Sequence, residues 1–412
     1  MTMPTRGPAA ALFCLACAAL TPAAAQQQPT AEVIHSFTSK SEMAAMKAFS
    51  DAFTAAGDKW VDSAVAGMPN ADTVLINRVI AGDPPAATRL IPGARLFALK
   101  DQDLLTTIDD VAAEGGWKDV LPAPVYAAIA RDGHVWGAPF DISTQNFIFY
   151  NKEVLAKSGI TELPQTWEDF IAALDKIKAA GFTPLALGGQ PIWYYNMWTS
   201  VLVTTAGGDI FTRIYRDRDL SALEDPKVIL AAERFRSLRA YVDEGSPGRN
   251  WNDATALVIS GKAGFQLIGD WAKGEFLAAG LTPDKEFGCY IGFDGAPMIY
   301  GGNAFAFLKS KQPATIDGQK LLAKVVMDPA VQVEFARHKG SMPVRKDADV
   351  SNLDACARLA ITYLADPARS VIQSETLVTA QEVGELRALM GEFFNDINMS
   401  PEEMLEAFAD AL

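Results

Sequence analysis

The stretch Ala31-Glu-Val-Ile-His-Ser-Phe37 opens the segment that decides the fold. It predicts a short strand, and residues 41–53 follow as a helix with apolar residues at helical spacing and Ser41 as its N-cap. Residues 60–65 predict a second strand, residues 71–81 a second helix, and residues 87–90 a third strand. This alternation is typical of an α/β lobe whose sheet is covered on both faces, so we predict the α/β class.

A different pattern spans residues 135–151, which are apolar and extended with polar residues in the middle. A segment of this kind can cross from one lobe to another. Thr166 begins a helix that ends near Gly181, and Asp169 occupies its capping-box position. Further helices are predicted over 225–242, 254–260, 310–326, 330–338, 355–364, 380–394 and 401–411.

The N-terminal residues 1–25 predict a secretory signal peptide. Arg6 precedes the apolar run from Ala9 to Leu20, and Ala23-Ala24-Ala25 supplies a small-residue cleavage site. The run is too short to span a bilayer stably. The 412-residue chain is long enough for two lobes after cleavage. We therefore expect an exported protein located in the periplasm.

The net charge and the hydrophobic content limit the classes of molecule that this protein can bind. The formal charge is −14, and 49% of the residues are hydrophobic. The apolar fraction supports an ample core. The acidic balance argues against nucleic acids and anionic membranes, because both require basic patches. A neutral or weakly charged small ligand is compatible with this surface.

Two cysteines, Cys289 and Cys356, remain once the signal peptide is removed. Cysteines in an oxidising compartment usually pair, so we predict one disulfide between them, worth about 3–4 kcal/mol in the chain-entropy model. Two buried free thiols are the alternative.

Catalytic and cofactor motifs are missing from the sequence. It contains no G-x-S-x-G, H-E-x-x-H, P-loop or G-x-G-x-x-G pattern, and its three histidines are scattered. We therefore predict no metal site, no cofactor and no enzymatic activity. Two of the 50 Asp and Glu residues could still face each other as a glycosidase pair, so a secreted carbohydrate-active enzyme is the alternative.

Aromatic residues beside amides and carboxylates mark three segments. Gln190 to Trp198, Asn250-Trp-Asn-Asp and Gly269-Asp-Trp share this composition. A sugar ring stacks its C–H faces on aromatic planes, and its hydroxyls pair with planar polar groups. Single tryptophans more often belong to a core. In Gly269-Asp-Trp, however, the glycine permits close approach and the carboxylate is costly to bury alone, which favours a binding role.

These segments, together with Gly261-Lys-Ala-Gly and Lys339-Gly-Ser-Met-Pro-Val-Arg, resemble the periplasmic sugar-binding proteins of ABC importers, in the glucose-binding branch of the extracellular solute-binding family. The resemblance runs from about residue 32 to the end. It implies two lobes with an interdomain ligand cleft, a sugar as ligand and an ABC permease as partner. The first lobe is expected over 26–139 plus about 298–328, and the second over 140–297 plus about 329–412. A monomer is the simplest state for such a receptor.

The resemblance also implies the site residues. Glu42 would bind the sugar from the first lobe, Trp251 and Trp271 would stack from the second, Asp270 would accept a hydrogen bond, and Lys339 would donate one. Arg345 is placed in the same site, with bracing of its loop as its role. The other candidate ligand-binding residues are Ser36, Phe37, Arg89, Asp141, Trp193 and Asn303.

Several of those positions depart from the family pattern. Ser36-Phe37 stands where the family usually has two adjacent tryptophans, and Asn303 stands where it often has an aspartate. Loss of an aromatic platform costs on the order of 1 kcal/mol of stacking. Arg89 and Asp141 are candidates for binding a different hydroxyl or a charged substituent, with a surface or hinge ion pair as the alternative. The sequence therefore predicts a sugar or sugar-like ligand without fixing which one.

Overall fold

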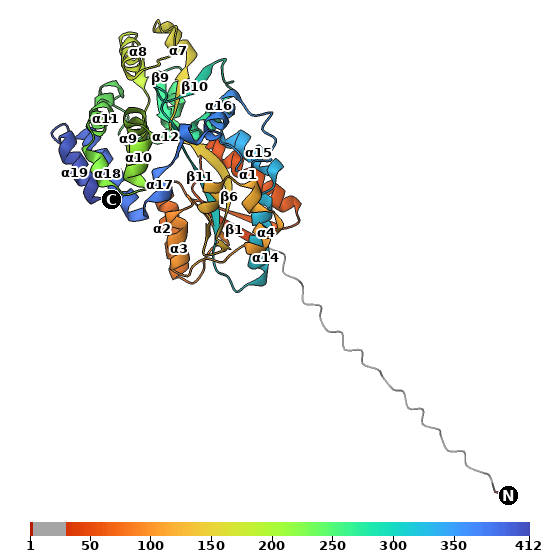
Figure 1. Ribbon diagram of the computed structural model, residues 1–412. Coiled ribbons are helices and arrows are strands. Elements are labelled where there is room, and N and C mark those ends of the chain that lie inside the picture. Colours follow the sequence, from red (N-terminus) through yellow and green to blue (C-terminus); the bar gives the residue numbers. More distant parts are fainter. Residues whose placement is uncertain (3–29) are drawn as a thin grey trace.

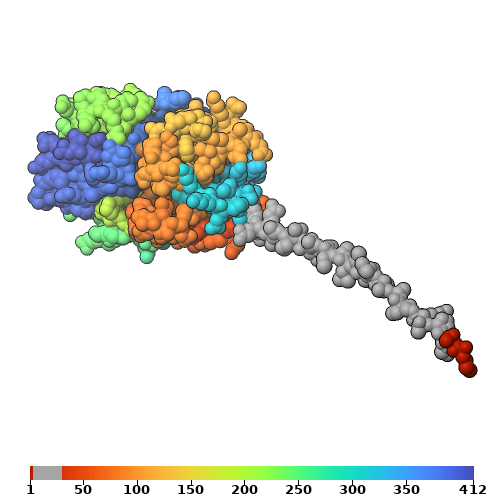
Figure 2. Space-filling model, turned by 90° about the horizontal axis from the view of Figure 1, so that it is seen from below, coloured from red at the N-terminus to blue at the C-terminus, as the bar shows by residue number. Residues whose placement is uncertain are grey.

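Figure 1 shows the computed structural model, which describes residues 1–2 and 30–412. Two α/β lobes lie one above the other in this view, so the predicted fold class is confirmed. Figure 2 shows the blue C-terminal residues beside an orange segment of the first lobe. All but two residues of the predicted signal peptide, 1–25, lie outside the described residues.

The lower, first lobe contains a six-stranded sheet in the order β12-β11-β3-β1-β2, with β6 also paired to β11. Strand β1 is parallel to β2 and β3, whereas β11 is antiparallel to β3 and β6. The strands of this sheet are β1 (Thr30–His35), β2 (Lys59–Ala64), β3 (Ala87–Leu90), β6 (Gly137–Thr144), β11 (Met298–Phe307) and β12 (Ser370–Ile372). The predicted strands at 60–65 and 87–90 therefore match β2 and β3.

A cluster of phenylalanines forms the centre of the first lobe. Phe49 stacks on Phe335 with ring centroids 4.6 Å apart, and Phe140 lies 4.6 Å from Phe305. The contact between Phe49 and Phe335 packs the helix over Lys40–Ala55 against the helix over Pro329–Lys339. The helices of this lobe are α1 (Lys40–Ala55), α2 (Met68–Ile80), α3 (Ala94–Asp101), α4 (Asp109–Glu114), α5 (Trp117–Val120), α6 (Ala123–Ala127), α14 (Pro313–Val326) and α15 (Pro329–Lys339), beside the small ribbon β4 (Ala130–Arg131) and β5 (His134–Val135).

The second lobe has a four-stranded sheet in the order β10-β7-β9-β8. Its strands are β7 (Phe147–Asn151), β8 (Thr183–Leu185), β9 (Ala263–Ile268) and β10 (Phe287–Ile291). Its helices are α7 (Lys152–Lys157), α8 (Trp167–Ala179), α9 (Pro191–Ala206), α10 (Gly208–Tyr215), α11 (Pro226–Ser237), α12 (Trp251–Ile259), α13 (Trp271–Ala278), α18 (Ala380–Asn395) and α19 (Pro401–Asp410). Figure 1 places α9, α11, α18 and α19 together at the upper left.

The chain passes between the two sheets at three places. The predicted extended segment 135–151 contains β6 of the first sheet and β7 of the second, joined by two residues. The second passage joins β10 to β11, and the third leaves β12 through α17 (Ser374–Leu377) toward α18. Within the expected second-lobe range 329–412, α15 packs on the first lobe and β12 joins the first sheet.

Local sequence explains how the helices begin. Ser39, not Ser41 as predicted, caps α1, because its hydroxyl accepts the Glu42 amide while the Glu42 carboxylate accepts the Ser39 amide. This reciprocal arrangement is a capping box. Thr166 and Asp169 form the predicted capping box at α8.

One covalent link joins the second sheet to helix α16 (Ala355–Leu364). Cys289 of β10 and Cys356 of α16 form the predicted disulfide, which spans 67 residues of chain. Among the described residues, no helix has the length and apolar character needed to cross a membrane.

Candidate functional site

Two hollows lie on opposite faces of the strands that connect the lobes. Neighbouring residues on a strand point to opposite faces. Ile142 and Ile372 accordingly line a cavity of about 1150 Å³, whereas Ser143 and Gln373 line a cleft of about 620 Å³. Most of the residues that line the larger cavity are apolar. The smaller hollow, called the cleft below, has the aromatic and polar side chains that a hydroxylated ligand needs.

Three tryptophans of the second lobe line the cleft. The Trp193 ring lies 6.3 Å from that of Trp251 and 6.2 Å from that of Trp271, between centroids. Trp193 stands in the first turn of α9, and the other two begin α12 and α13. Gly269 lets the Trp271 indole fold back over the chain, since a Cβ there would lie 2.1 Å from the ring. The remaining aromatic residues of the 190–198 segment are buried in the core.

Phe37 supplies an aromatic surface from the first lobe. The Arg89 guanidinium carbon lies 4.8 Å from its centroid, and Lys339 Nζ lies 5.2 Å from it. Lys339 Nζ is also 5.4 Å from the Trp271 centroid, so this lysine lies at the boundary of the two lobes. Burial lowers the pKa of Arg89 to about 10, which leaves it protonated at neutral pH.

Glu42 lies at the edge of the cleft and is buried. Its Oε2 accepts hydrogen bonds from the amides of Thr38 and Ser39, both at 3.1 Å. The capping box therefore fixes the carboxylate in place at the start of α1. Next to it, Ser41 bridges the lobes, because its amide and hydroxyl both donate to Glu275 of α13, at 3.0 and 2.6 Å.

Asp141 lies beneath the cleft, below Asn303. Its Oδ1 accepts the Asn303 amide at 2.8 Å and Nδ2 at 2.7 Å, and its Oδ2 accepts the Ser143 hydroxyl at 3.2 Å. Burial raises the pKa of Asp141, against the opposing effect of Lys339 and Arg89. This arrangement orients Asn303 so that its side chain lines the cleft.

Asp270 is the second buried carboxyl close to the cleft. Its Oδ2 accepts the Thr144 amide at 2.7 Å, which ties the start of α13 to the end of β6. Burial raises the pKa of Asp270 to about 7, with Lys339 acting in the opposite direction. Neither Asp270 nor Asp141 is among the residues that line the cleft. Both hold the connecting strands and the cleft residues in position.

Sequence reasoning missed a polar group at the floor of the cleft. Gln145 Nε2 donates to Gln373 Oε1 at 2.7 Å and to Glu375 Oε2 at 3.0 Å, and Arg387 pairs with Glu375 at 3.3 Å. Gln145 lies at the polar middle of the 135–151 segment, which was the one available signal. The others come from residues 373–387, where no local pattern distinguishes them from a solvated surface.

Several buried polar atoms of cleft residues have no hydrogen-bond partner within the described part of the chain. They are Arg89 Nε, Asn252 Oδ1, Trp271 Nε1, Asn303 Oδ1 and Arg387 Nε. Buried donors and acceptors are nearly always satisfied in folded proteins. Their concentration around one cleft indicates a polar ligand with both donors and acceptors.

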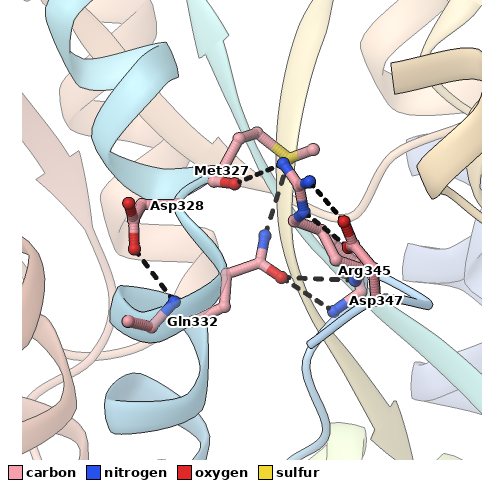
Figure 3. A network of polar contacts seen from close by, with 7 residues as sticks. Met327, Asp328, Gln332, Arg345 and Asp347 are labelled. Carbon is pink, nitrogen blue, oxygen red and sulfur yellow. Dashed lines mark hydrogen bonds and ion pairs between the residues drawn. The ribbon is translucent and has the colours of Figure 1, made fainter. Parts of the chain in front are cut away.

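Of the twelve predicted site residues, nine line the cleft, Asp141 and Asp270 lie beneath it, and Arg345 lies outside it. The nine are Ser36, Phe37, Glu42, Arg89, Trp193, Trp251, Trp271, Asn303 and Lys339. Arg345 requires a correction, because it borders the larger cavity instead. Its guanidinium pairs with Asp347 at 2.7 Å and donates to the Met327 carbonyl at 3.0 Å (Figure 3). Gln332 Oε1 accepts its amide, so Arg345 fastens the loop after α15.

Comparisons with known proteins agree with this geometry. The family model of the bacterial extracellular solute-binding proteins matches residues 38–331. The chain is 38% identical over 356 residues to a "Probable sugar-binding periplasmic protein" of Brucella melitensis, covering 84% of this chain and 83% of that protein. It is 38% identical to a protein of the same name from Rhizobium meliloti, covering 83% of each. A solved "Chitin oligosaccharide binding protein" shares the fold, with a TM-score of 0.78, 20% identity, and coverage of 93% of this chain and 98% of that one.

Proposed function

The chain belongs to the bacterial extracellular solute-binding protein family, and we propose that it is the periplasmic receptor of an ABC importer, which captures a sugar or sugar-like solute between its lobes. The names of the relatives from Brucella melitensis and Rhizobium meliloti support both the ligand class and the periplasmic location. The permease subunits of the importer are its expected protein partners, and a monomer is the expected state.

The composition of the cleft carries this proposal. Trp193, Trp251 and Trp271 present aromatic surface, and five unpartnered buried polar atoms surround the same space. A sugar ring is the common solute that combines apolar faces with a belt of hydroxyls. Each unpartnered group that gains a hydroxyl partner contributes about 0.5–1.5 kcal/mol, and more when the group is charged.

Binding is expected to close the lobes on the ligand. A ligand shifts a conformational equilibrium only by its differential affinity for the two states. Phe37, Glu42 and Arg89 belong to the first lobe and the tryptophans to the second, so a sugar in the cleft contacts both. The three connecting passages are the hinges about which such closure occurs. The closed form would then be recognised by the permease.

The alternative of a glycoside hydrolase has no support. The family and its named relatives are binding proteins. A hydrolase needs a carboxylic acid of raised pKa facing its substrate. Among the described residues, the two buried carboxyls of raised pKa, Asp141 and Asp270, lie outside the cleft lining and are held by amide groups of the protein.

The proposal is tested by a thermal-shift screen of the mature protein against mono- and disaccharides, including sugar acids and phosphorylated sugars. A bound ligand raises the melting temperature by mass action. Tryptophan fluorescence, with three indoles in the cleft, then gives the affinity. The expected result is saturable binding of a carbohydrate without turnover. Failure of every carbohydrate to bind, or hydrolysis of a bound glycoside, would contradict the proposal.

A further inference from the structure

Two buried lysines of the described chain differ in one respect. Lys273 is 1% exposed and Lys339 is 2% exposed. Lys273 Nζ lies 2.8 Å from Asp354 Oδ2 and has an ion-pair partner. Within residues 30–412, Lys339 has neither an ion pair nor a side-chain hydrogen bond; its ammonium lies near the rings of Phe37 and Trp271 and interacts at longer range with Asp141 and Asp270. A buried ammonium is stabilised by an anion in direct contact, and no carboxylate of the described residues contacts Lys339, so its ammonium can pair with an anionic group from outside the chain.

Arg89, whose guanidinium also lies near the Phe37 ring, likewise has no charged partner in contact within the described part of the chain. Its NH1 group donates to Ser36 Oγ at 3.3 Å and contacts Met68 Sδ at 2.8 Å, which are both uncharged partners. Its Nε is buried without a partner in the described residues. Two cationic groups thus lie near one phenyl ring and line one cleft, and neither has a carboxylate of residues 30–412 in contact.

The nearby carboxylates are occupied elsewhere. Glu42 Oε2 accepts two backbone amides, and both oxygens of Asp141 accept hydrogen bonds from Asn303 and Ser143. Asp141 nevertheless acts at longer range on both Arg89 and Lys339, Asp270 acts on Lys339, and Glu42 acts on Arg89. The site therefore favours a single negative charge over a dianion such as phosphate, which these carboxylates would repel.

We propose that the solute is a sugar acid, whose carboxylate binds to Arg89 and Lys339 while its ring lies against the tryptophans. This inference rests on the proposed receptor function and specifies its substrate class. A guanidinium and an ammonium together offer charge-assisted hydrogen bonds to both oxygens of a carboxylate. Asn303 Oδ1, unpartnered and lining the cleft, accepts a hydroxyl of the same molecule.

Isothermal titration of the mature protein with matched pairs tests the proposal: glucose against glucuronate and gluconate, and galactose against galacturonate. At least one acid is expected to bind ten-fold or more tightly than its neutral counterpart, and glucose 6-phosphate to bind more weakly than that acid. Replacement of either cation, Arg89→Gln or Lys339→Gln, is expected to weaken binding of the acid at least ten-fold and to weaken binding of the neutral sugar by a clearly smaller factor, so that the preference for the acid is lost.

The control is Arg234→Gln, which removes a guanidinium that lies 5.0 Å from the Trp167 centroid and pairs with Glu168, outside the cleft lining. It is expected to keep the preference for the acid. Neutral hexoses that bind as tightly as their acids would overturn this inference and leave the receptor function standing. The absence of binding by any carbohydrate would overturn both.

Discussion

The Trp271→Ala variant removes the aromatic side chain that borders both Trp193 and Lys339. The indole lies 6.2 Å from the Trp193 ring and 5.4 Å from the Lys339 ammonium. It stands at the start of α13, where a small side chain is compatible with the helix. The variant is therefore expected to fold and to lose part of its affinity for the solute.

The size of the loss follows from the area that the ring presents. A large aromatic side chain buries 150–250 Å², so one face in contact with a sugar accounts for about 100 Å². At about 25 cal/mol per Å², this area contributes roughly 2.5 kcal/mol. The corresponding loss of affinity is about 50- to 100-fold, since every 1.4 kcal/mol is a factor of ten. Isothermal titration with the best solute of the thermal-shift screen measures it.

A second variant displaces the same indole without removing it. In Gly269→Ala the new Cβ would lie 2.1 to 2.6 Å from three atoms of the Trp271 ring, so the ring must shift by roughly 1 Å in a close-packed site. Affinity is expected to fall about ten-fold or more with every tryptophan still present. If both Trp271→Ala and Gly269→Ala bind within three-fold of the wild type, the placement of the ligand against this ring is wrong.

Three further predictions concern stability and pH. Reduction of Cys289–Cys356 is expected to lower the free energy of unfolding by about 3–4 kcal/mol, measured by urea titration with and without reductant; an unchanged midpoint would contradict it. Because burial raises the pKa of Asp270 to about 7, the folded state holds its proton more tightly than the unfolded state, and this carboxyl makes stability fall as pH rises from about 4 to 7. Asp270→Asn, which can still accept the Thr144 amide, is expected to flatten that slope in unfolding curves; an unchanged slope would refute the assignment. Gly384→Ala within α18, where an added Cβ meets nothing within 4 Å, should raise the unfolding free energy by about 0.5–1 kcal/mol, and a lower melting temperature would count against the helix geometry.

Much of the fold was predictable because its determinants are local. Apolar periodicity located the helices at 313–326, 355–364 and 380–395 within a few residues, and it located the strand at 87–90. The extended segment 135–151 was recognisable as a crossing because polar residues interrupt an otherwise buried run. The N-cap of α1 was misplaced by two residues, since only the reciprocal bonds between Ser39 and Glu42 distinguish it from Ser41.

The site was less predictable because it depends on distant pairings. Gln145, Gln373 and Arg387 meet only after the first and third passages between the lobes have been placed, and of the three only Gln145 is marked by a local pattern. Arg345 lies in the loop that follows Lys339. Its guanidinium binds Asp347 and the Met327 carbonyl beside α15, so its side chain does not reach the cleft. Sequence motifs thus identified the aromatic part of the cleft and not its polar floor.

A crystal structure of the protein with the best-binding solute of the screen tests the central claim most directly. We predict electron density for one solute molecule in the cleft, between Phe37 and Arg89 of the first lobe and Trp193 and Trp271 of the second. Density in the cavity of about 1150 Å³ on the opposite face of the connecting strands, with the cleft holding only water, would contradict it.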